Sequence, residues 1–286
     1  MKTTVICFTN NKGGSGKSTV CANLGYELAS SGKRVLLLDG DMQMNLTLSY
    51  FSEEETISMA QSGKTLYEAI CDKADLADFI VSTRYGGLDL VPSSSLMSQV
   101  EFRLFTMMQR EFVLANCLLG IKEKGAYDYI LIDAPPTLGN WVINILAASD
   151  YCVMPVEASP WGLFGLANMF DFLDSVSGFC PVSLLGVLIT KVDERKKYYR
   201  QTCDVLSQYS DIPVFKTVIH VDSAVEWAED NSIPVSVFKK SARSAVEFAQ
   251  LSKEIIKYNN KEVSHGSRKK QYGKSIKKDG DDRKNR

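Results

Sequence analysis

The stretch Asn11-Lys12-Gly13-Gly14-Ser15-Gly16-Lys17-Ser18-Thr19 decides the fold. It follows an apolar run at residues 3–9 and opens a helical pattern at residues 18–30. Glycines let the backbone turn tightly so that successive N–H groups face one point, and the helix N-terminus adds partial positive charge there. Such a loop binds phosphate, with Lys17 on the β- and γ-phosphates and the Ser18 hydroxyl on Mg²⁺. A glycine-rich turn without a ligand is the alternative.

Short apolar runs alternate with longer amphipathic stretches along the chain. The predicted strands are 3–9, 34–39, 88–92, 127–133, 151–156, 184–190 and 214–219, and the predicted helices are 18–30, 96–124, 163–175, 199–209 and 242–258. Runs nearly continuous in Val, Ile and Leu are typical of strands covered on both faces. The alternation predicts an α/β fold, a mostly parallel sheet flanked by helices.

The charge of the chain is unevenly distributed. Residues 260–286 hold ten Lys or Arg and four Asp or Glu, a charge of +6, so with a net charge of −1 the remainder carries −7. Apolar periodicity stops after Tyr258. We therefore predict one domain over residues 1–259 and a basic, disordered tail over 260–286, which either touches a polyanion or is functionally silent.

Composition excludes several classes of protein. The seven cysteines are scattered without CxxC spacing and there are two histidines, which argues against a disulfide framework or a cysteine-histidine metal site. No leader peptide is recognisable, and no apolar run approaches the roughly 18 residues that span a bilayer. We expect a cytoplasmic protein without membrane contact.

Three carboxylates follow predicted strands. Asp39 and Asp41 come after the second run, in Leu36-Leu37-Leu38-Asp39-Gly40-Asp41-Met42-Gln43-Met44-Asn45, and Asp133 ends the run 127–133. The carboxyl ends of parallel strands share one sheet edge, where ligands of open α/β folds bind. We expect these side chains near the phosphate loop. A simple loop-capping role is the alternative for Asp39 and Asp41.

Lys-Gly-Gly-x-Gly-Lys-Ser is a deviant Walker A motif, and by it the chain resembles the ParA/MinD family of ATPases. The resemblance implies the three-layer fold of P-loop NTPases, ATP and Mg²⁺ as ligands, and contacts from all residues of the loop: Lys12, Gly13, Gly14, Ser15, Gly16, Lys17, Ser18 and Thr19. In that family the early lysine, here Lys12, reaches the phosphates held by a partner subunit. ATP is thereby sandwiched in a homodimer.

The same resemblance extends to the carboxylates. The segment at 39–45 is similar to the family's D-x-D-x-Q-x-N, with Met42 where proline is usual. The match implies that Asp41 orients the attacking water, so that the predicted catalytic residues are Lys12, Lys17 and Asp41. It implies Ser18, Asp133 and Asp39 around the metal. Ala134-Pro135-Pro136 resembles the family's second switch loop. Residues near Thr190 and Ile219 would contact the base.

The branch of the family decides the biological role. The DNA-partition branch is favoured, with nonspecific DNA binding by the dimer and a centromere-bound ParB-like partner that stimulates slow hydrolysis. Candidate DNA contacts are Arg195, Lys196, Lys197 and Arg200, for which a solvated helix start is the alternative. The family's basic element corresponds to residues 220–224, which hold no Lys or Arg. An ATPase that positions a protein cargo, and below it a metabolic P-loop ligase or kinase, remain alternatives.

Overall fold

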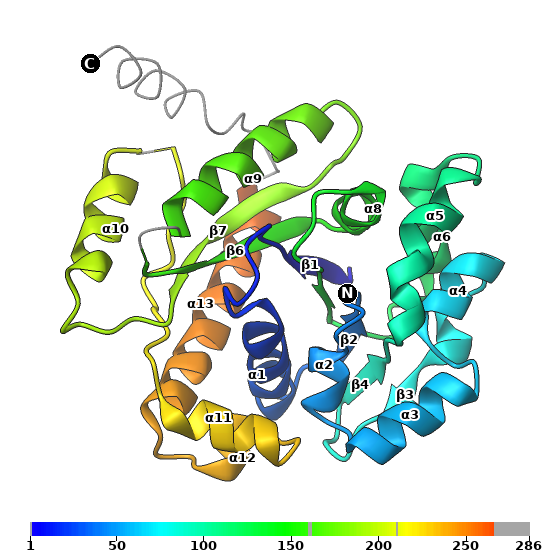
Figure 1. Ribbon diagram of the computed structural model, residues 1–286, viewed down its shortest axis with the longest axis horizontal. Coiled ribbons are helices and arrows are strands. Elements are labelled where there is room, and N and C mark those ends of the chain that lie inside the picture. The colour runs from blue at the N-terminus through cyan, green and yellow to red at the C-terminus, as the bar shows by residue number, and fades with distance from the viewer. Residues whose placement is uncertain (1, 160–161, 210, 266–286) are drawn as a thin grey trace.

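The computed structural model describes residues 2–159, 162–209 and 211–265. Its centre is a seven-stranded sheet in the order β3-β4-β2-β5-β1-β6-β7 (Figure 1). The strands are β1 (Thr4–Phe8), β2 (Val35–Asp39), β3 (Val81–Ser82), β4 (Leu88–Val91), β5 (Tyr129–Asp133), β6 (Tyr151–Glu157) and β7 (Ser183–Thr190). All pairs are parallel except β3 with β4. The predicted mostly parallel α/β sheet is confirmed.

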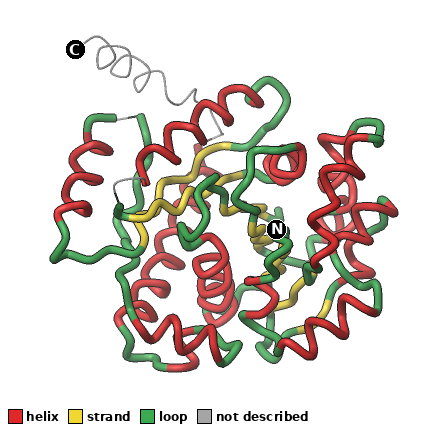
Figure 2. The backbone as a smooth tube through the Cα atoms, in the orientation of Figure 1, coloured by secondary structure: helices red, strands yellow, loops and turns green. Residues whose placement is uncertain are grey.

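Helices cover both faces of the sheet, as the tube view in Figure 2 also shows. Successive β1 residues point to opposite sides, so that Val5 and Cys7 join one core while Ile6 and Phe8 join the other. Because both faces of the strand are buried, its residues are apolar at successive positions and do not alternate with polar ones. One face is covered by α1 (Lys17–Ser30), α2 (Asn45–Leu48), α11 (Ser223–Asp230), α12 (Val235–Phe238) and α13 (Arg243–His265). The other is covered by α4 (Leu66–Asp72), α5 (Val100–Phe105), α6 (Val113–Cys117), α8 (Asn140–Ala148), α9 (Gly162–Val176) and α10 (Lys197–Ser207).

The predicted strand 214–219 is wrong as a regular strand. The segment runs beside β7 and makes isolated bridges, with Val187 N donating to Pro213 O (2.8 Å) and Ile219 N donating to Ile189 O (2.9 Å). Between these points the N–H groups of Lys216 and Thr217 donate to the Glu254 carboxylate instead. A side chain from α13 therefore replaces the strand ladder, which periodicity does not reveal.

The predicted helix 96–124 is also wrong as one element. It is divided into the 3₁₀ turns η2 (Ser95–Gln99) and η3 (Arg110–Phe112), with α5, α6 and α7 (Leu119–Lys124). At the break, Gln109 has φ 52°, and the buried Asn144 side chain accepts from Leu114 N and donates to Arg110 O. These bonds satisfy backbone groups that a continuous helix would pair internally.

Near the C-terminus, α13 continues to His265. The helix therefore passes residue 260, and the division into a domain over 1–259 and a tail over 260–286 stays a prediction. The rest of the predicted basic tail, 266–286, lies outside the described residues. Within the described residues no helix is both long and apolar enough to cross a bilayer. Also present are α3 (Glu53–Gln61) and the turn η1 (Leu76–Phe79).

Candidate nucleotide-binding site

The glycine-rich loop lies between the end of β1 and the start of α1, in the middle of the sheet's carboxyl edge. Gly14 and Gly16 have φ of 73° and 88°, which other residues adopt at a cost. Gly16 directly precedes the helix that begins at Lys17. The loop is tied to β7 because the Thr190 hydroxyl donates to Ser15 O at 2.8 Å. The N-terminus of α1 is thereby directed at the space above the loop.

A cavity of about 470 Å³ opens above this loop, and we call it the phosphate cavity. Seven of the predicted residues line it: Gly13, Gly14, Gly16, Lys17, Ser18, Thr19 and Asp41. The other lining residues are Gln43, Asn45, Leu48, Ser49, Pro136, Lys191, Glu229 and Asp230. Sequence analysis did not name Lys191, Glu229 or Asp230 as site residues, because they come from the end of β7 and from α11, with no motif around them.

Lys17 lines the phosphate cavity and interacts electrostatically with Asp133, which is buried next to it; we call this pair the floor. Burial lowers the pKa of Lys17, while Asp133 and Asp41 oppose that shift. Burial, together with the charge of Asp39, raises the pKa of Asp133, and the Ser18 hydroxyl and the Lys17 charge act in the opposite direction. Asp133 is fully buried, yet neither carboxylate oxygen has a protein hydrogen-bond partner of standard geometry. Such a group needs an external partner.

Asp39 has a different environment. Its Oδ2 accepts from Thr47 N at 2.8 Å and from the Thr47 hydroxyl at 2.7 Å, and its Oδ1 accepts from Asp41 N at 3.2 Å. Burial raises the pKa of Asp39 to about 6, although the bonds from Thr47 and Asp41 lower it. These contacts connect the end of β2 to α2. Asp39 thus holds the loop, and its role beside a metal stays a prediction.

The loop after β2 packs tightly against β5. Gly40 N donates to Asp133 O at 3.0 Å, and Gly40 O accepts from the Trp141 indole at 2.8 Å. A Cβ on Gly40 would lie 2.6 Å from Asp133 O, so only glycine fits. Asp41, which follows, is buried and lines the phosphate cavity. Its Oδ1 accepts from Gln43 N at 3.1 Å.

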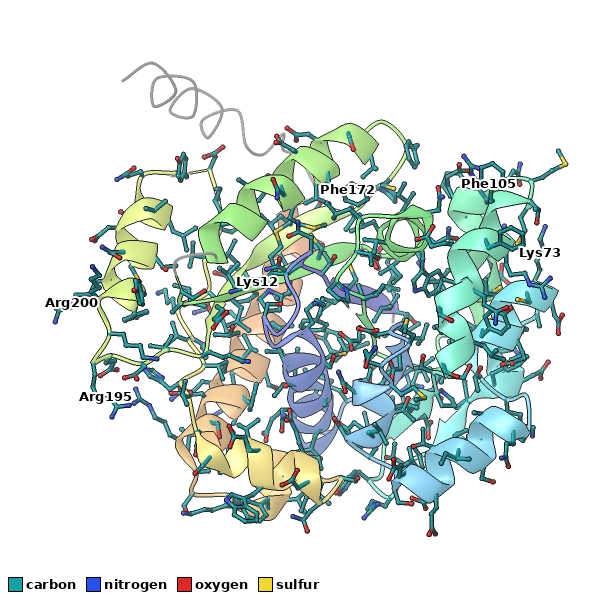
Figure 3. All side chains as sticks on the ribbon, in the orientation of Figure 1. Lys12, Lys73, Phe105, Phe172, Arg195 and Arg200 are labelled. Atoms are coloured by element: carbon teal, nitrogen blue, oxygen red, sulfur yellow. The ribbon has the colours of Figure 1, made fainter. Side chains whose placement is uncertain are left out.

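Lys12 is not among the residues that line the phosphate cavity. Its ammonium donates to the Glu157 carboxylate in a short ion pair and to the Ser159 hydroxyl at 2.9 Å. Burial alone would raise the pKa of Glu157, but the bond from Lys12 and its charge hold that pKa below the ordinary value. Figure 3 shows Lys12 near the middle of this face of the molecule. Lys17 therefore lines the phosphate cavity, whereas the Lys12 ammonium is bonded to Glu157 and Ser159 outside it.

A second cavity of about 300 Å³, the distal cavity, adjoins the first. Gly16, Thr19, Lys191 and Glu229 line both. Its walls are mostly apolar and include Val20, Thr190, Ile219, Val225 and Phe248. The two residues expected near a base, Thr190 and Ile219, are therefore brought together beside the phosphate cavity. The pair of cavities matches the shape of a nucleotide, a charged end joined to an apolar one.

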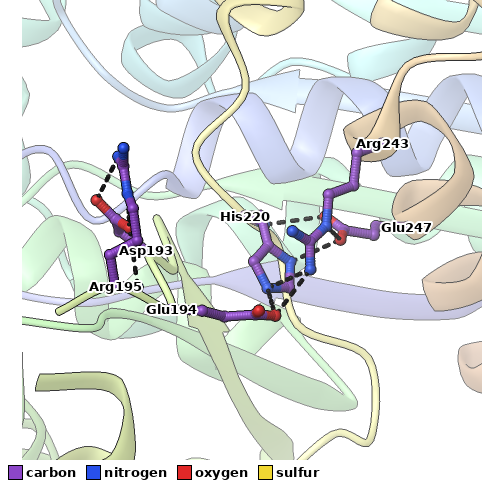
Figure 4. Close-up of polar contacts among 6 residues, drawn as sticks. All are labelled: Asp193, Glu194, Arg195, His220, Arg243 and Glu247. Carbon is purple, nitrogen blue, oxygen red and sulfur yellow. Dashed lines mark hydrogen bonds and ion pairs between the residues drawn. The ribbon is translucent and has the colours of Figure 1, made fainter. Parts of the chain in front are cut away.

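A polar cluster fixes the wall of the distal cavity (Figure 4). His220 Nδ1 lies 2.6 Å from Glu247 Oε1, and His220 N donates to Glu247 Oε2 at 2.9 Å. Arg243 Nε donates to Glu247 Oε1 at 3.0 Å, and His220 Nε2 lies 2.9 Å from Glu194 Oε1. The segment after residue 219 is thereby held to α13.

The four candidate DNA contacts lie on and before α10, and Figure 3 shows Arg195 and Arg200 at the margin of the molecule. All four are exposed. Arg195 pairs with Asp193 at 2.8 Å, and Lys196 lies 4.0 Å from the same carboxylate. Lys197 lies over the Tyr198 ring. Asp193 therefore offsets part of this positive charge.

The metal prediction agrees with the chemistry of the floor. Among the described residues, no three His, Cys, Asp or Glu side chains are grouped to hold a metal by themselves. Mg²⁺ prefers oxygen ligands and retains several waters, so it is commonly held by one or two protein oxygens and the substrate's phosphates. The Ser18 hydroxyl, which lines the phosphate cavity, and the buried Asp133 carboxylate next to it are oxygen donors of this kind, and their part in binding Mg²⁺ stays a prediction.

Comparison with known proteins gives consistent matches. The AAA domain family model matches residues 3–180. The sporulation initiation inhibitor protein Soj of Bacillus subtilis is 34% identical over 253 residues, 88% of this chain and 97% of that protein. The chromosome partitioning protein ParA of Caulobacter vibrioides is 31% identical over 255 residues, covering 88% and 93%. A putative plasmid partition protein from Borrelia burgdorferi, solved bound to AMPPNP, superposes with a TM-score of 0.73 at 23% identity, covering 90% of this chain and 99% of that one.

Proposed function

This chain belongs to the ParA/Soj family, and on that premise we propose that it is an ATPase that uses ATP binding to dimerise and that partitions plasmid or chromosomal DNA. The ligands are ATP and Mg²⁺. Hydrolysis returns the dimer to monomers, so the slow rate of hydrolysis sets the lifetime of the dimer.

One observation carries the proposal: the two loop lysines are separated. Lys17 lines the phosphate cavity of its own chain, while Lys12 is held outside it by Glu157 and Ser159. An ammonium held outside the cavity of its own chain can exchange the Glu157 carboxylate for phosphates bound in another subunit. Triphosphate bound in one chain then attracts Lys12 of the second chain, which couples dimerisation to the γ-phosphate.

The residues of the floor have distinct tasks in hydrolysis. Backbone N–H groups at Gly13–Lys17 and the Lys17 ammonium stabilise charge that develops on the phosphates. Ser18 and Asp133 would hold Mg²⁺, which when bound would supply positive charge against the phosphates. Asp41 lines the cavity and orients the attacking water. Positioning of this kind accounts for most of the catalysis in phosphoryl transfer.

DNA binding is assigned to the exposed cations Arg195, Lys196, Lys197 and Arg200. Contacts of this type neutralise phosphates, release counterions and weaken as salt rises. A ParB-like protein on the centromere would then stimulate hydrolysis and release the dimer. The protein would act in the cytoplasm, at the nucleoid while it is bound to DNA.

The test combines ATP hydrolysis, molecular mass in solution and co-sedimentation with nonspecific duplex DNA at two salt concentrations. Lys17→Ala should lose nucleotide binding, whereas Lys12→Ala should bind ATP as a monomer and fail to bind DNA. Lys253→Met, an exposed lysine on α13, is the control for loss of one positive charge. An ATP-bound wild-type monomer, or a Lys12→Ala protein that still dimerises, would contradict the switch.

A second candidate is an ATPase that positions a protein cargo. The surface before and on α11 favours it, because the large apolar side chains Val221 and Trp227 are 61% and 59% exposed there. Apolar side chains of this kind bind protein rather than phosphate. A dimer that forms with ATP but ignores DNA at low salt would favour this candidate.

A further inference from the structure

Lys191 comes from a distant part of the chain and reaches the glycine-rich loop. It follows β7 directly and lines both the phosphate cavity and the distal cavity. Its Nζ lies 4.0 Å from the point where a Cβ on Gly14 would stand. The ammonium therefore lies over the loop, at the junction where the charged cavity meets the apolar one.

The backbone of Lys191 has an unusual conformation with φ 51°, in the left-handed region. A non-glycine residue persists there only when its surroundings hold it, and such residues concentrate at functional sites. Here both neighbours are held: Ala158 N donates to Thr190 O at 3.0 Å, and Val192 N donates to Ile219 O at 3.0 Å. The Thr190 hydroxyl bond to Ser15 fixes the strand end to the loop. The backbone at Lys191, from which the side chain starts, is thus held in place by the fold.

The Lys191 ammonium shares its two cavities with the Glu229 carboxylate but forms no ion pair in the described part of the chain. Glu157 is near enough for Lys191 to help lower its pKa, but that carboxylate is bonded to Lys12. Among the described residues no carboxylate lies within ion-pair distance of the Lys191 ammonium. An exposed cation directed into a cavity beside backbone N–H groups attracts an anion.

We propose that Lys191 is a third phosphate-binding lysine, which contacts the α-phosphate of a nucleotide bound in its own chain. Lys191 lies where the phosphate cavity meets the distal cavity, so it would face the phosphate that is attached to the sugar. Lys17 lies deeper in the phosphate cavity and would face the phosphates farther from the sugar. The assignment rests on the nucleotide binding in the proposed function and is independent of dimerisation. It implies that the affinity for nucleoside mono-, di- and triphosphates depends on Lys191, whereas the affinity for the bare nucleoside does not.

The test measures the affinity of the full chain for ADP, AMP and adenosine by titration calorimetry, at two salt concentrations. Lys191→Met should weaken ADP and AMP binding by about tenfold and leave adenosine binding unchanged, because a charged hydrogen bond to phosphate is lost. The difference should shrink at high salt. Lys191→Arg should retain most of the affinity, and Lys253→Met should match the wild type.

Two results would overturn this assignment. ADP affinity that is unchanged in Lys191→Met excludes a phosphate contact, and an equal loss for adenosine places the contact on the sugar or base. Thermal unfolding checks each variant, and Lys191→Gln replaces the methionine variant if that one misfolds. A wild-type chain that binds no ADP would overturn both proposals. Normal ADP binding in a chain that stays monomeric when ATP is added would overturn only the ATP switch, and the Lys191 measurements would still decide this assignment.

Discussion

The phosphate cavity and the distal cavity adjoin each other but are built in different ways. Most of the phosphate cavity comes from one continuous stretch, residues 13–19, together with the loop after β2. The distal cavity uses only Gly16, Thr19 and Val20 from that part of the chain, and the rest of it is assembled from the end of β7, the segment 219–222, α11 and one side chain of α13. A cavity made by consecutive backbone groups is visible in sequence, whereas a wall assembled from distant side chains is not.

The two cavities also differ in how their charges are balanced. In the phosphate cavity Lys17 is desolvated, and next to it the buried Asp133 carboxylate has no hydrogen-bond partner of standard geometry. Beside the distal cavity, His220, Glu247 and Arg243 satisfy one another. The first region therefore depends on its ligands, while the second is complete without them. Variants of Lys17, Asp133, Gly40 and Thr190 test this difference between the two cavities.

The largest effect is expected for Lys17→Ala. Loss of this ammonium removes a cation placed against the phosphates, so steady-state ATP hydrolysis should fall about 10²- to 10³-fold. Glu226→Gln, which removes a charge from the wall of the distal cavity, should change the rate by less than about threefold because Glu226 is exposed. Similar losses in the two variants would erase the distinction between the cavities.

Asp133→Asn should separate stability from ligand response. Without nucleotide or Mg²⁺ at neutral pH, the variant should be more stable than the wild type by about 1–3 kcal/mol, since the cost of burying a carboxylate that accepts no hydrogen bond of standard geometry is removed. It should also lose much of the stabilisation that Mg²⁺ and ATP confer. Thermal unfolding with and without ligands measures both. A variant that is less stable in both conditions would mean that the carboxylate has an internal partner.

The same floor predicts a pH dependence. Asp39 has a folded pKa of about 6 and Asp133 is shifted in the same direction, whereas an unfolded aspartate has a pKa of about 3.9. The folded chain then holds more protons, so the free energy of unfolding should fall as the pH rises from about 4 to 6. Urea unfolding of the ligand-free protein tests this, and the fall should be shallower in Asp133→Asn. A rise over that range would contradict the assignment.

Gly40→Ala should destabilise the protein by about 1–3 kcal/mol, because the added methyl would overlap Asp133 O. Gly86→Ala is the matched control, since a Cβ there meets nothing within 4 Å. Chemical denaturation of both variants gives the comparison. Equal stability would show that the loop after β2 can move away from β5.

The smallest effect is expected where the two cavities are joined. Thr190→Val removes the hydroxyl that donates to Ser15 O and should cost about 1 kcal/mol of stability. ADP affinity should fall as well if that bond positions the loop. Denaturant unfolding and ADP titration would measure the two effects. An ADP affinity equal to that of the wild type would show that the loop holds its shape without β7.

Much of the fold followed from local patterns. Six of the seven predicted strands are confirmed within two residues at each end, because their Val, Ile and Leu runs are buried on both faces. The segment 214–219 failed because Glu254 takes its N–H groups, and the helix 96–124 failed because Asn144 stabilises a break. Both errors arise from side chains on other elements. The antiparallel β3, two residues long, carried no signal.

The sequence by itself determined the phosphate loop, the strand ends that bear Asp39, Asp41 and Asp133, and the family. These features are legible because a loop that turns on glycines and opens a helix needs particular residues at consecutive positions. Only the tertiary structure decided that Asp39 is bonded within the loop while Asp133 is left without a partner, that Lys12 is held by Glu157, and that Lys191 reaches Gly14. The physical reason is that hydrogen bonding and desolvation depend on neighbours from distant strands and helices, which local sequence does not specify.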